Sequence, residues 1–184
     1  MKKIIIVLVA VAGSIAAKAQ HTAFGFKGGL NISDFSNYNG VNFSSRTSFY
    51  VGGLAHIHVA RHFAVQPELL FSDQGARYSG TTYKNRYINI PVLAQFMVGN
   101  GFRLETGPQL GFLVSAKNET GNVTVDVKDS YNTTDFAWAF GAGYLSSSHF
   151  GVDARYNLGL SDFTESSATI RNNVFQLGVF YQLK

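Results

Sequence analysis

The stretch FGVDARYNLGLS, residues 150–161, carries an apolar side chain at every second position. Residues i and i+2 of a β-strand lie on the same face, so the stretch predicts a strand with one apolar and one polar face. The apolar face holds Phe150, Val152, Ala154, Tyr156, Leu158 and Leu160. The polar face carries two opposite charges, Asp153 and Arg155, among Gly, Asn and Ser. The fold therefore depends on which of the two faces meets the solvent.

Seven further segments repeat this alternation, and none of the eight shows a sustained helical period. They are residues 22–33, 48–59, 63–72, 87–98, 102–115, 136–144 and 175–183. Long polar connections alternate with short turns along the chain. We expect the long connections at 34–46, 73–85, 116–133 and 162–172, and the short turns at 60–62, 99–101 and 146–149. This order predicts an up-and-down meander with all its long connections at one end.

Two barrels fit such a meander: a soluble lipocalin-like barrel with an apolar interior, and a membrane barrel with an apolar exterior. The polar faces are mostly Gly, Ala, Gln, Asn and Ser, and charged residues make up only 14% of the chain, against about 25% in typical soluble domains. Glycine and alanine cover a water-facing surface poorly, but they fit inside a narrow barrel. We therefore predict an all-β fold, an eight-stranded antiparallel up-and-down transmembrane β-barrel. A soluble periplasmic lipocalin-like lipid carrier is the alternative.

Six charged residues fall on the inward face of this barrel. They are Lys27, Glu68, Arg103, Glu105, Asp153 and Arg155. They come from four alternate strands, three are positive and three negative, and all lie near the end with the short turns. Buried charges cost several kcal/mol each unless they are paired. We therefore predict an internal network of salt bridges that plugs the lumen; hydration of these charges in a wet lumen is the alternative.

The chain begins with MKKIIIVLVAVAGSIAAKA, in which two lysines precede an apolar run and small residues follow. This layout predicts a secretory signal peptide over residues 1–19, cleaved before Gln20, rather than a first helix of the fold. Residues 20–184 then form one domain, and its formal charge falls from +4 to +1. No basic run remains that would indicate nucleic acid as a partner. We expect an exported protein in the outer membrane of a Gram-negative bacterium, with membrane lipid as its partner.

Three prolines, Pro67, Pro91 and Pro108, lie inside expected strands. A closed barrel has no free edge where proline is tolerated, so each predicts either a bulge or a gap in the hydrogen-bond ladder.

The polar residues suggest no catalytic, cofactor or metal site. His56 and His58 share a face and His62 follows them, which suits either a metal site or isolated interior histidines. The histidines map to the end with the short turns, whereas the loop carboxylates map to the other end. An outer-membrane acyltransferase or protease is therefore a less favoured alternative to a non-enzymatic protein.

The long connections are rich in aromatic residues: Phe35, Tyr38, Phe43, Tyr78, Tyr83, Tyr131 and Phe163. They suit binding of an extracellular protein or carbohydrate, or packing against one another. An eight-stranded barrel has room inside only for side chains, so we expect a monomeric envelope or loop-mediated binding component rather than a diffusion porin.

Several stretches resemble the PorT-like small outer-membrane β-barrel proteins of Bacteroidota. They are YINIPVLAQF at 87–96, GPQLGFLVSAK at 107–117, FGAGY at 140–144, ARYNLGLSDF at 154–163 and FQLGVFYQLK at 175–184. The resemblance implies an eight-stranded barrel, no shared catalytic residues and, for some members, a link to secretion and gliding. Two positions depart from the family: Gln95 stands where a basic residue is common, and Lys184 ends the chain instead of an aromatic residue.

Overall fold

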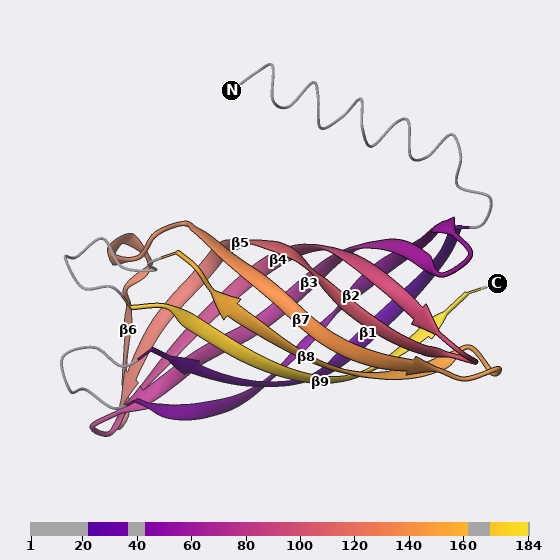
Figure 1. The fold of residues 1–184 in the computed structure, drawn as a ribbon. Coiled ribbons are helices and arrows are strands. Elements are labelled where there is room, and N and C mark those ends of the chain that lie inside the picture. Colours follow the sequence, from indigo (N-terminus) through magenta and orange to yellow (C-terminus); the bar gives the residue numbers. More distant parts are fainter. Residues whose placement is uncertain (1–21, 37–42, 162–169, 184) are drawn as a thin grey trace, which may run out of the picture.

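The strands of the protein wrap into one closed, elongated barrel (Figure 1). A computed structural model describes residues 22–36, 43–161 and 170–183. Its elements are β1 (Thr22–Phe35), β2 (Ser44–Ala60), β3 (Phe63–Tyr78), β4 (Thr81–Val98), β5 (Phe102–Thr120), β6 (Val123–Asp126), a 3-10 helix η1 (Lys128–Ser130), β7 (Thr134–Leu145), β8 (Phe150–Gly159) and β9 (Asn172–Gln182). No helix in these ranges is long and apolar enough to cross a membrane.

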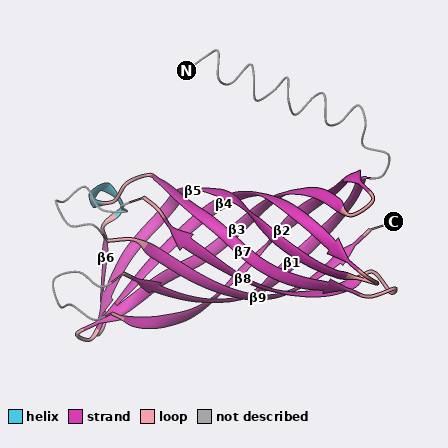
Figure 2. Ribbon diagram, in the orientation of Figure 1, coloured by secondary structure: helices cyan, strands magenta, loops and turns pink. Residues whose placement is uncertain are grey.

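Each strand of the barrel pairs antiparallel with its neighbours in the chain, and β1 pairs with β9 to close the cylinder. Eight strands form the wall, because β6 pairs only with the outer end of β5 (Figure 2). The predicted eight-stranded antiparallel up-and-down transmembrane barrel is therefore confirmed. Every wall strand is paired on both sides, which is what a sheet in hydrocarbon requires.

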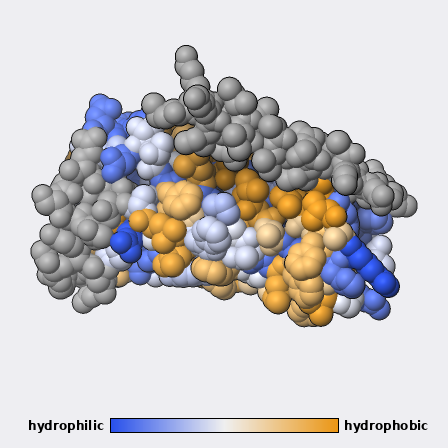
Figure 3. Space-filling view, turned by 45° about the horizontal axis from the view of Figure 1, so that its top comes forward, coloured by the Kyte–Doolittle hydropathy of each residue, from blue (hydrophilic) through white to orange (hydrophobic). Residues whose placement is uncertain are grey.

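The apolar faces of the strands point outward. Phe150 is 63% exposed on β8, whereas Arg155 on the same strand is 1% exposed. Figure 3 shows hydrophobic side chains along the middle of the outer surface and hydrophilic ones towards its ends, as expected for a band in contact with lipid. The alternative of a soluble barrel with an apolar interior is therefore wrong.

The three short turns lie where they were predicted, and the three hairpins meet at the end where β1 begins and β9 ends. Short turns are typical of the periplasmic side of outer-membrane barrels, so we call this the periplasmic end.

The opposite, extracellular end differs from the prediction, because the strands are longer than expected. The connection predicted at 73–85 is a tight hairpin: β3 continues to Tyr78 and β4 starts at Thr81. Similarly, the connection predicted at 116–133 contains the end of β5, then β6 and η1. Outside the membrane both faces of a strand meet water or polar groups, so the apolar–polar alternation that revealed the strands disappears there.

The three prolines mark gaps in the ladder and not bulges. Pro67 lies in a gap of the β2–β3 pairing, Pro91 in one between β3 and β4, and Pro108 in one between β4 and β5. The register is the same on both sides of each gap, and each proline keeps its pairing with the strand on its other side. Each missing amide hydrogen therefore interrupts one ladder without shifting the strands.

Candidate functional site

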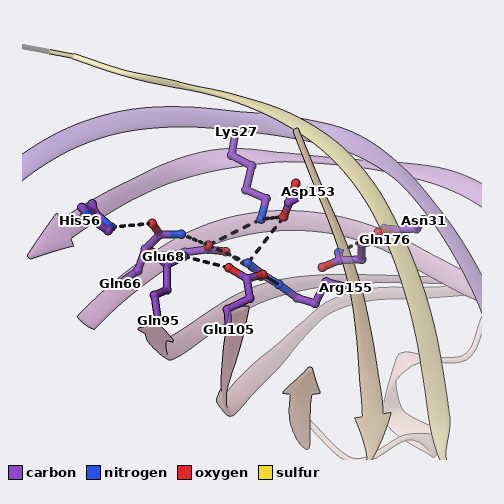
Figure 4. Close-up of polar contacts among 10 residues, drawn as sticks. All are labelled: Lys27, Asn31, His56, Gln66, Glu68, Gln95, Glu105, Asp153, Arg155 and Gln176. Atoms are coloured by element: carbon purple, nitrogen blue, oxygen red, sulfur yellow. Dashed lines mark hydrogen bonds and ion pairs between the residues drawn. The ribbon is translucent and has the colours of Figure 1, made fainter. Parts of the chain in front are cut away.

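The lumen contains a network of ion pairs centred on Arg155 of β8 (Figure 4). Its guanidinium donates from Nη1 and Nη2 to both carboxylate oxygens of Glu68 on β3, at 2.8 and 2.9 Å. Its Nε donates to Oε1 of Glu105 on β5, at 2.8 Å. This bidentate contact and the third bond fix the guanidinium plane, a geometry that lysine cannot provide. Arg155 therefore ties together three strands that are not neighbours in the wall.

Lys27 of β1, two strands from β8 in the wall, completes the network. Its ammonium contacts the Asp153 carboxylate directly and lies 3.6 Å from Oε1 of Glu68. Asp153 Oδ2 is also 3.8 Å from Nη2 of Arg155. All these side chains are nearly inaccessible to solvent, so each charge depends on the others for compensation. We call Lys27, Glu68, Glu105, Asp153 and Arg155 the central network.

Amide side chains fill the remaining hydrogen-bonding positions of the two glutamates. Gln66 donates to Glu68 at 2.7 Å, and Gln95 donates to Glu105 at 2.8 Å. Nδ1 of His56 lies 3.3 Å from Oε1 of Gln66. Gln95 is the position that departs from the PorT-like pattern, and here its neutral amide supports a carboxylate that already has a cationic partner.

Arg103 is the one predicted charge that stands apart from the others. It points inward from β5, and its guanidinium lies over the ring of Phe180, 5.3 Å from the centroid. Within the described ranges it forms no ion pair within 4 Å, and its Nε and Nη1 have no hydrogen-bond partner. The central network has two positive and three negative charges, so Arg103 balances its charge without a direct contact.

A second polar layer, which the alternation of the sequence does not predict, lies closer to the extracellular end. The β2–β3 register shifts between Ser45 and Tyr50, which leaves part of this ladder unpaired. Asn31 of β1 donates to the Phe49 carbonyl, the Ser72 hydroxyl and the Asp73 carbonyl, at 3.1, 2.9 and 2.7 Å. Side chains from β1 thus satisfy backbone groups that the ladder leaves free.

The same layer holds an ion pair between Arg46 and Asp73, whose Nη2 and Oδ2 atoms are 2.6 Å apart. Arg46 also donates to the Gln74 carbonyl at 2.9 Å. The sequence interpretation placed both charges in loops, and the structure corrects this: Arg46 lies in β2 and Asp73 in β3. We call Asn31, Arg46, Asp73 and their hydrogen-bond partners the outer layer.

Four of the predicted loop aromatics pack against one another at the extracellular mouth. Phe43 contacts Phe35, Tyr78 and Tyr83, with ring centroids 5.4 to 6.2 Å apart. Tyr131 packs against the same cluster, and burial there raises the pKa of its hydroxyl. The remaining two, Tyr38 and Phe163, lie outside the described residues.

The histidines do not assemble a reactive site in the described part of the chain. The rings of His56 and His58 meet edge to face, 4.6 Å apart, at the periplasmic end. The residues that the structure describes contain no group of three or more His, Cys, Asp or Glu side chains arranged to hold a metal ion. Glu68, the carboxylate nearest to them in the sequence, is bound to Arg155.

Structural comparison places the fold among small outer-membrane barrels. Neisserial surface protein A matches with a TM-score of 0.63 and 13% identity, over 89% of this chain and all of that one. Ail, the attachment invasion locus protein of Yersinia pestis, matches with a TM-score of 0.58 and 15% identity over the same shares. The N-terminal β-barrel domain of Pseudomonas aeruginosa OprF gives a TM-score of 0.50 and 12% identity, over 89% of this chain and 98% of that one. At these identities the likeness concerns the fold.

No curated protein matches the sequence. A family model described as outer membrane protein beta-barrel domain, however, matches residues 18–165, which cover most of the chain. The closed barrel, its lipid-facing exterior and its charged interior agree with this match. The chain is an outer-membrane β-barrel protein and belongs to the outer membrane protein beta-barrel domain family.

Proposed function

We propose that this protein is a non-enzymatic membrane anchor with a plugged lumen, which displays a binding surface outside the cell. The observation that carries the proposal is the central network, in which Arg155 bridges β3 and β5 across the interior. A cylinder of eight strands has room only for side chains, and here those side chains are joined by ion pairs.

The plug is tested by electrical recording. In planar lipid bilayers we expect no steady conductance from the wild-type protein. The variant Glu68→Ala/Arg155→Ala removes the ion pair that crosses the lumen, so brief openings in this variant would support the plug. A steady pore of nanosiemens conductance in the wild type would contradict it.

The binding surface we propose is a platform formed by the outer ends of β3, β4 and β5 together with β6. Its outward residues include Arg77, Lys84, Arg86 and Lys117, with Glu119 and Asp126 as the acidic members. Lys84 is paired with Glu119 at 2.5 Å. Arg77 and Arg86 are exposed, and neither forms an ion pair with a described residue. The platform therefore offers two unpaired guanidinium groups to a ligand.

Of the extracellular partners considered, an anionic carbohydrate suits this platform best. Arginine recognises sulfate and phosphate groups through paired hydrogen bonds. Ail, which shares the fold, has been crystallised with the heparin analogue sucrose octasulfate. Two rings of the aromatic cluster, those of Tyr78 and Tyr83, belong to the platform strands β3 and β4, and both pack against Phe43.

This role is tested by binding of a heparin oligosaccharide to the protein in lipid nanodiscs. We expect Arg77→Gln/Arg86→Gln to weaken binding at least tenfold, because two charge-assisted contacts are lost. Lys128→Gln/Arg171→Gln removes the same number of exposed charges from the extracellular end, outside the platform, and is the matched control. Equal losses in the two variants would show that binding follows net charge and would contradict the platform. Binding of a protein in place of the carbohydrate would also contradict this ligand class.

We also propose that the protein is a member of the PorT-like proteins of Bacteroidota, which the stretches YINIPVLAQF and GPQLGFLVSAK support.

The proposal further includes export with cleavage before Gln20, and a monomeric barrel. The mass of the protein recovered from carbonate-washed outer membranes tests the cleavage, and a mass that retains residues 1–19 would contradict it. Light scattering in detergent tests whether the barrel is a monomer.

A further inference from the structure

A cavity of about 420 Å³ opens at the periplasmic end of the barrel, away from the platform. We call it the periplasmic pocket, and its polar lining residues are His56, His58, Arg61, His62, Arg103 and Gln182. They come from β2, the turn after it, β5 and β9. The lining contains two arginines and three histidines but no carboxylate, so its charge is positive.

Arg103 is the residue that makes this pocket unusual. Its side chain is almost fully buried, at 4% exposure, yet its Nε and Nη1 have no hydrogen-bond partner. A buried donor that stays unsatisfied costs free energy, and charged donors cost most. Arg155 and Gln95 already hold the carboxylates of Glu68 and Glu105. The guanidinium of Arg103, which lines the pocket, is therefore left for an acceptor that enters from there.

The surrounding residues hold the guanidinium in this position. Phe180 provides a ring face beneath it, and Gly151 leaves the space that the ring needs, since a Cβ there would lie 2.1 Å from the Phe180 ring. Gly143, the partner of Arg103 on β7, has no Cβ and leaves room for the arginine stem, since a Cβ there would lie 3.4 Å from Cγ of Arg103. Arg103 is therefore oriented by packing, and ligand binding requires little further ordering of it.

We propose that the periplasmic pocket binds a compact oxyanion, a phosphate group, through Arg103 and Arg61. Arg103 lines the pocket with a guanidinium whose Nε and Nη1 have no partner among the described residues, and Arg61 lies exposed in the turn after β2 as a second cation. The two arginines disfavour a metal cation in the same space, and Nδ1 of His56 faces Gln66. The pocket is large enough for a tetrahedral group and part of the molecule that carries it.

The phosphate has two sources at this level of the membrane, a soluble phosphate ester or the headgroup of a lipid. Phe102 lines the pocket and is 59% exposed on the outer surface of the barrel, so one wall of the pocket adjoins the lipid. A lipid with a phosphate headgroup reaches the pocket from that side, and a soluble ester reaches it from the periplasm.

The test measures thermal unfolding of the purified barrel in an uncharged maltoside detergent. One arm adds inorganic phosphate and compares it with chloride at equal ionic strength; the other adds lysophosphatidic acid and compares it with monoacylglycerol. We expect the midpoint to rise with at least one phosphate probe, because a ligand that binds only the folded state stabilises it. A response to both probes, or to inorganic phosphate alone, assigns a phosphate site open to soluble esters. A response to lysophosphatidic acid alone assigns a lipid site.

Arg103→Gln and Arg61→Gln should each raise the phosphate concentration needed for a given shift at least tenfold. Arg61 is exposed, so its variant keeps the fold even if Arg103→Gln unfolds. Arg171→Gln removes an exposed arginine at the other end, outside the platform, and is the matched control; it should respond like the wild type. The absence of a shift with both probes, or an unchanged response in Arg61→Gln, would overturn the proposal. Equal loss in Arg171→Gln would overturn it as well.

Discussion

The central network and the outer layer satisfy polar groups inside the same barrel in two different ways. In the central network, whole charges from non-adjacent strands meet across the lumen, and Arg155 alone bonds to two glutamates. In the outer layer, most contacts run from a side chain to the backbone of nearby strands, as Asn31 does with the carbonyls of Phe49 and Asp73. The first arrangement joins opposite walls of the barrel, and the second repairs a break in one wall.

This difference predicts which substitutions should lower the free energy of unfolding most. Removing one member of a buried, multiply paired charge cluster leaves several charges uncompensated. The outer layer holds a single ion pair near the extracellular mouth, where water can hydrate a carboxylate that loses its partner. The cost of substitution should therefore fall from the central network to the outer layer and then to the rim.

Arg155→Leu should have the largest effect. It leaves Glu68 and Glu105 without their main cation, and we expect a loss of about 3–5 kcal/mol in the free energy of unfolding. The measurement is the temperature at which the folded band on unboiled gels gives way to the unfolded one. Arg77→Leu, which removes an exposed arginine, is the control and should shift this temperature little. Equal shifts in the two variants would show that the central network does not stabilise the barrel.

Arg46→Leu should cost less, about 2 kcal/mol, because it frees one carboxylate, Asp73, and one backbone carbonyl, that of Gln74. The same gel assay ranks it against Arg155→Leu. A cost equal to or larger than that of Arg155→Leu would reverse the proposed order of the two regions.

The central network was predictable because its charges interrupt strongly alternating segments. Asp153 and Arg155 lie between apolar neighbours, and Lys27 follows Phe24 and Phe26 at alternate positions. Their inward direction therefore follows from the period of a strand. Arg46 and Asp73 gave no such signal, since each lies in a run of polar residues that also suits a loop. The one sign that the strands continue into this region is a run of small or polar residues at every second position. These residues are Asn31 and Ser33 on β1, and Ser72, Gln74 and Ala76 on β3.

The sequence could not predict that Arg103 has no ion-pair partner among the described residues, for a different reason. Its inward direction follows from the alternation, but its contacts depend on its height relative to side chains on other strands. That height is set by the stagger of the strands around the cylinder, which a single strand does not encode. Sequence reasoning thus identified the charged interior but not which charges touch.

Gly178→Ala tests the central network without changing a charge. A Cβ at this position on β9 would lie 1.9 Å from the Tyr50 hydroxyl and 2.7 Å from Oδ1 of Asp153. The crowding should displace Tyr50 and Asp153 and cost about 1–2 kcal/mol. Gly53→Ala is the matched control, because the nearest atom to a Cβ there is a carbonyl oxygen at an ordinary 3.6 Å. A gel transition of Gly178→Ala at the temperature of the control would mean that the lumen has more free space than the structure shows.

Lys84→Gln should have the smallest effect. Its ion pair with Glu119 is as short as those of the interior, at 2.5 Å, but both side chains keep about a third of their surface exposed. Water hydrates each charge when the partner is removed, so exposed pairs of this kind contribute about 0.2–1 kcal/mol. We expect a gel transition close to that of the wild type, and chemical unfolding in urea can detect the small remainder. A loss as large as that of Arg46→Leu would mean that the outer ends of β4 and β5 are held together by this pair, and that short distance, and not burial, governs the strength of ion pairs in this barrel.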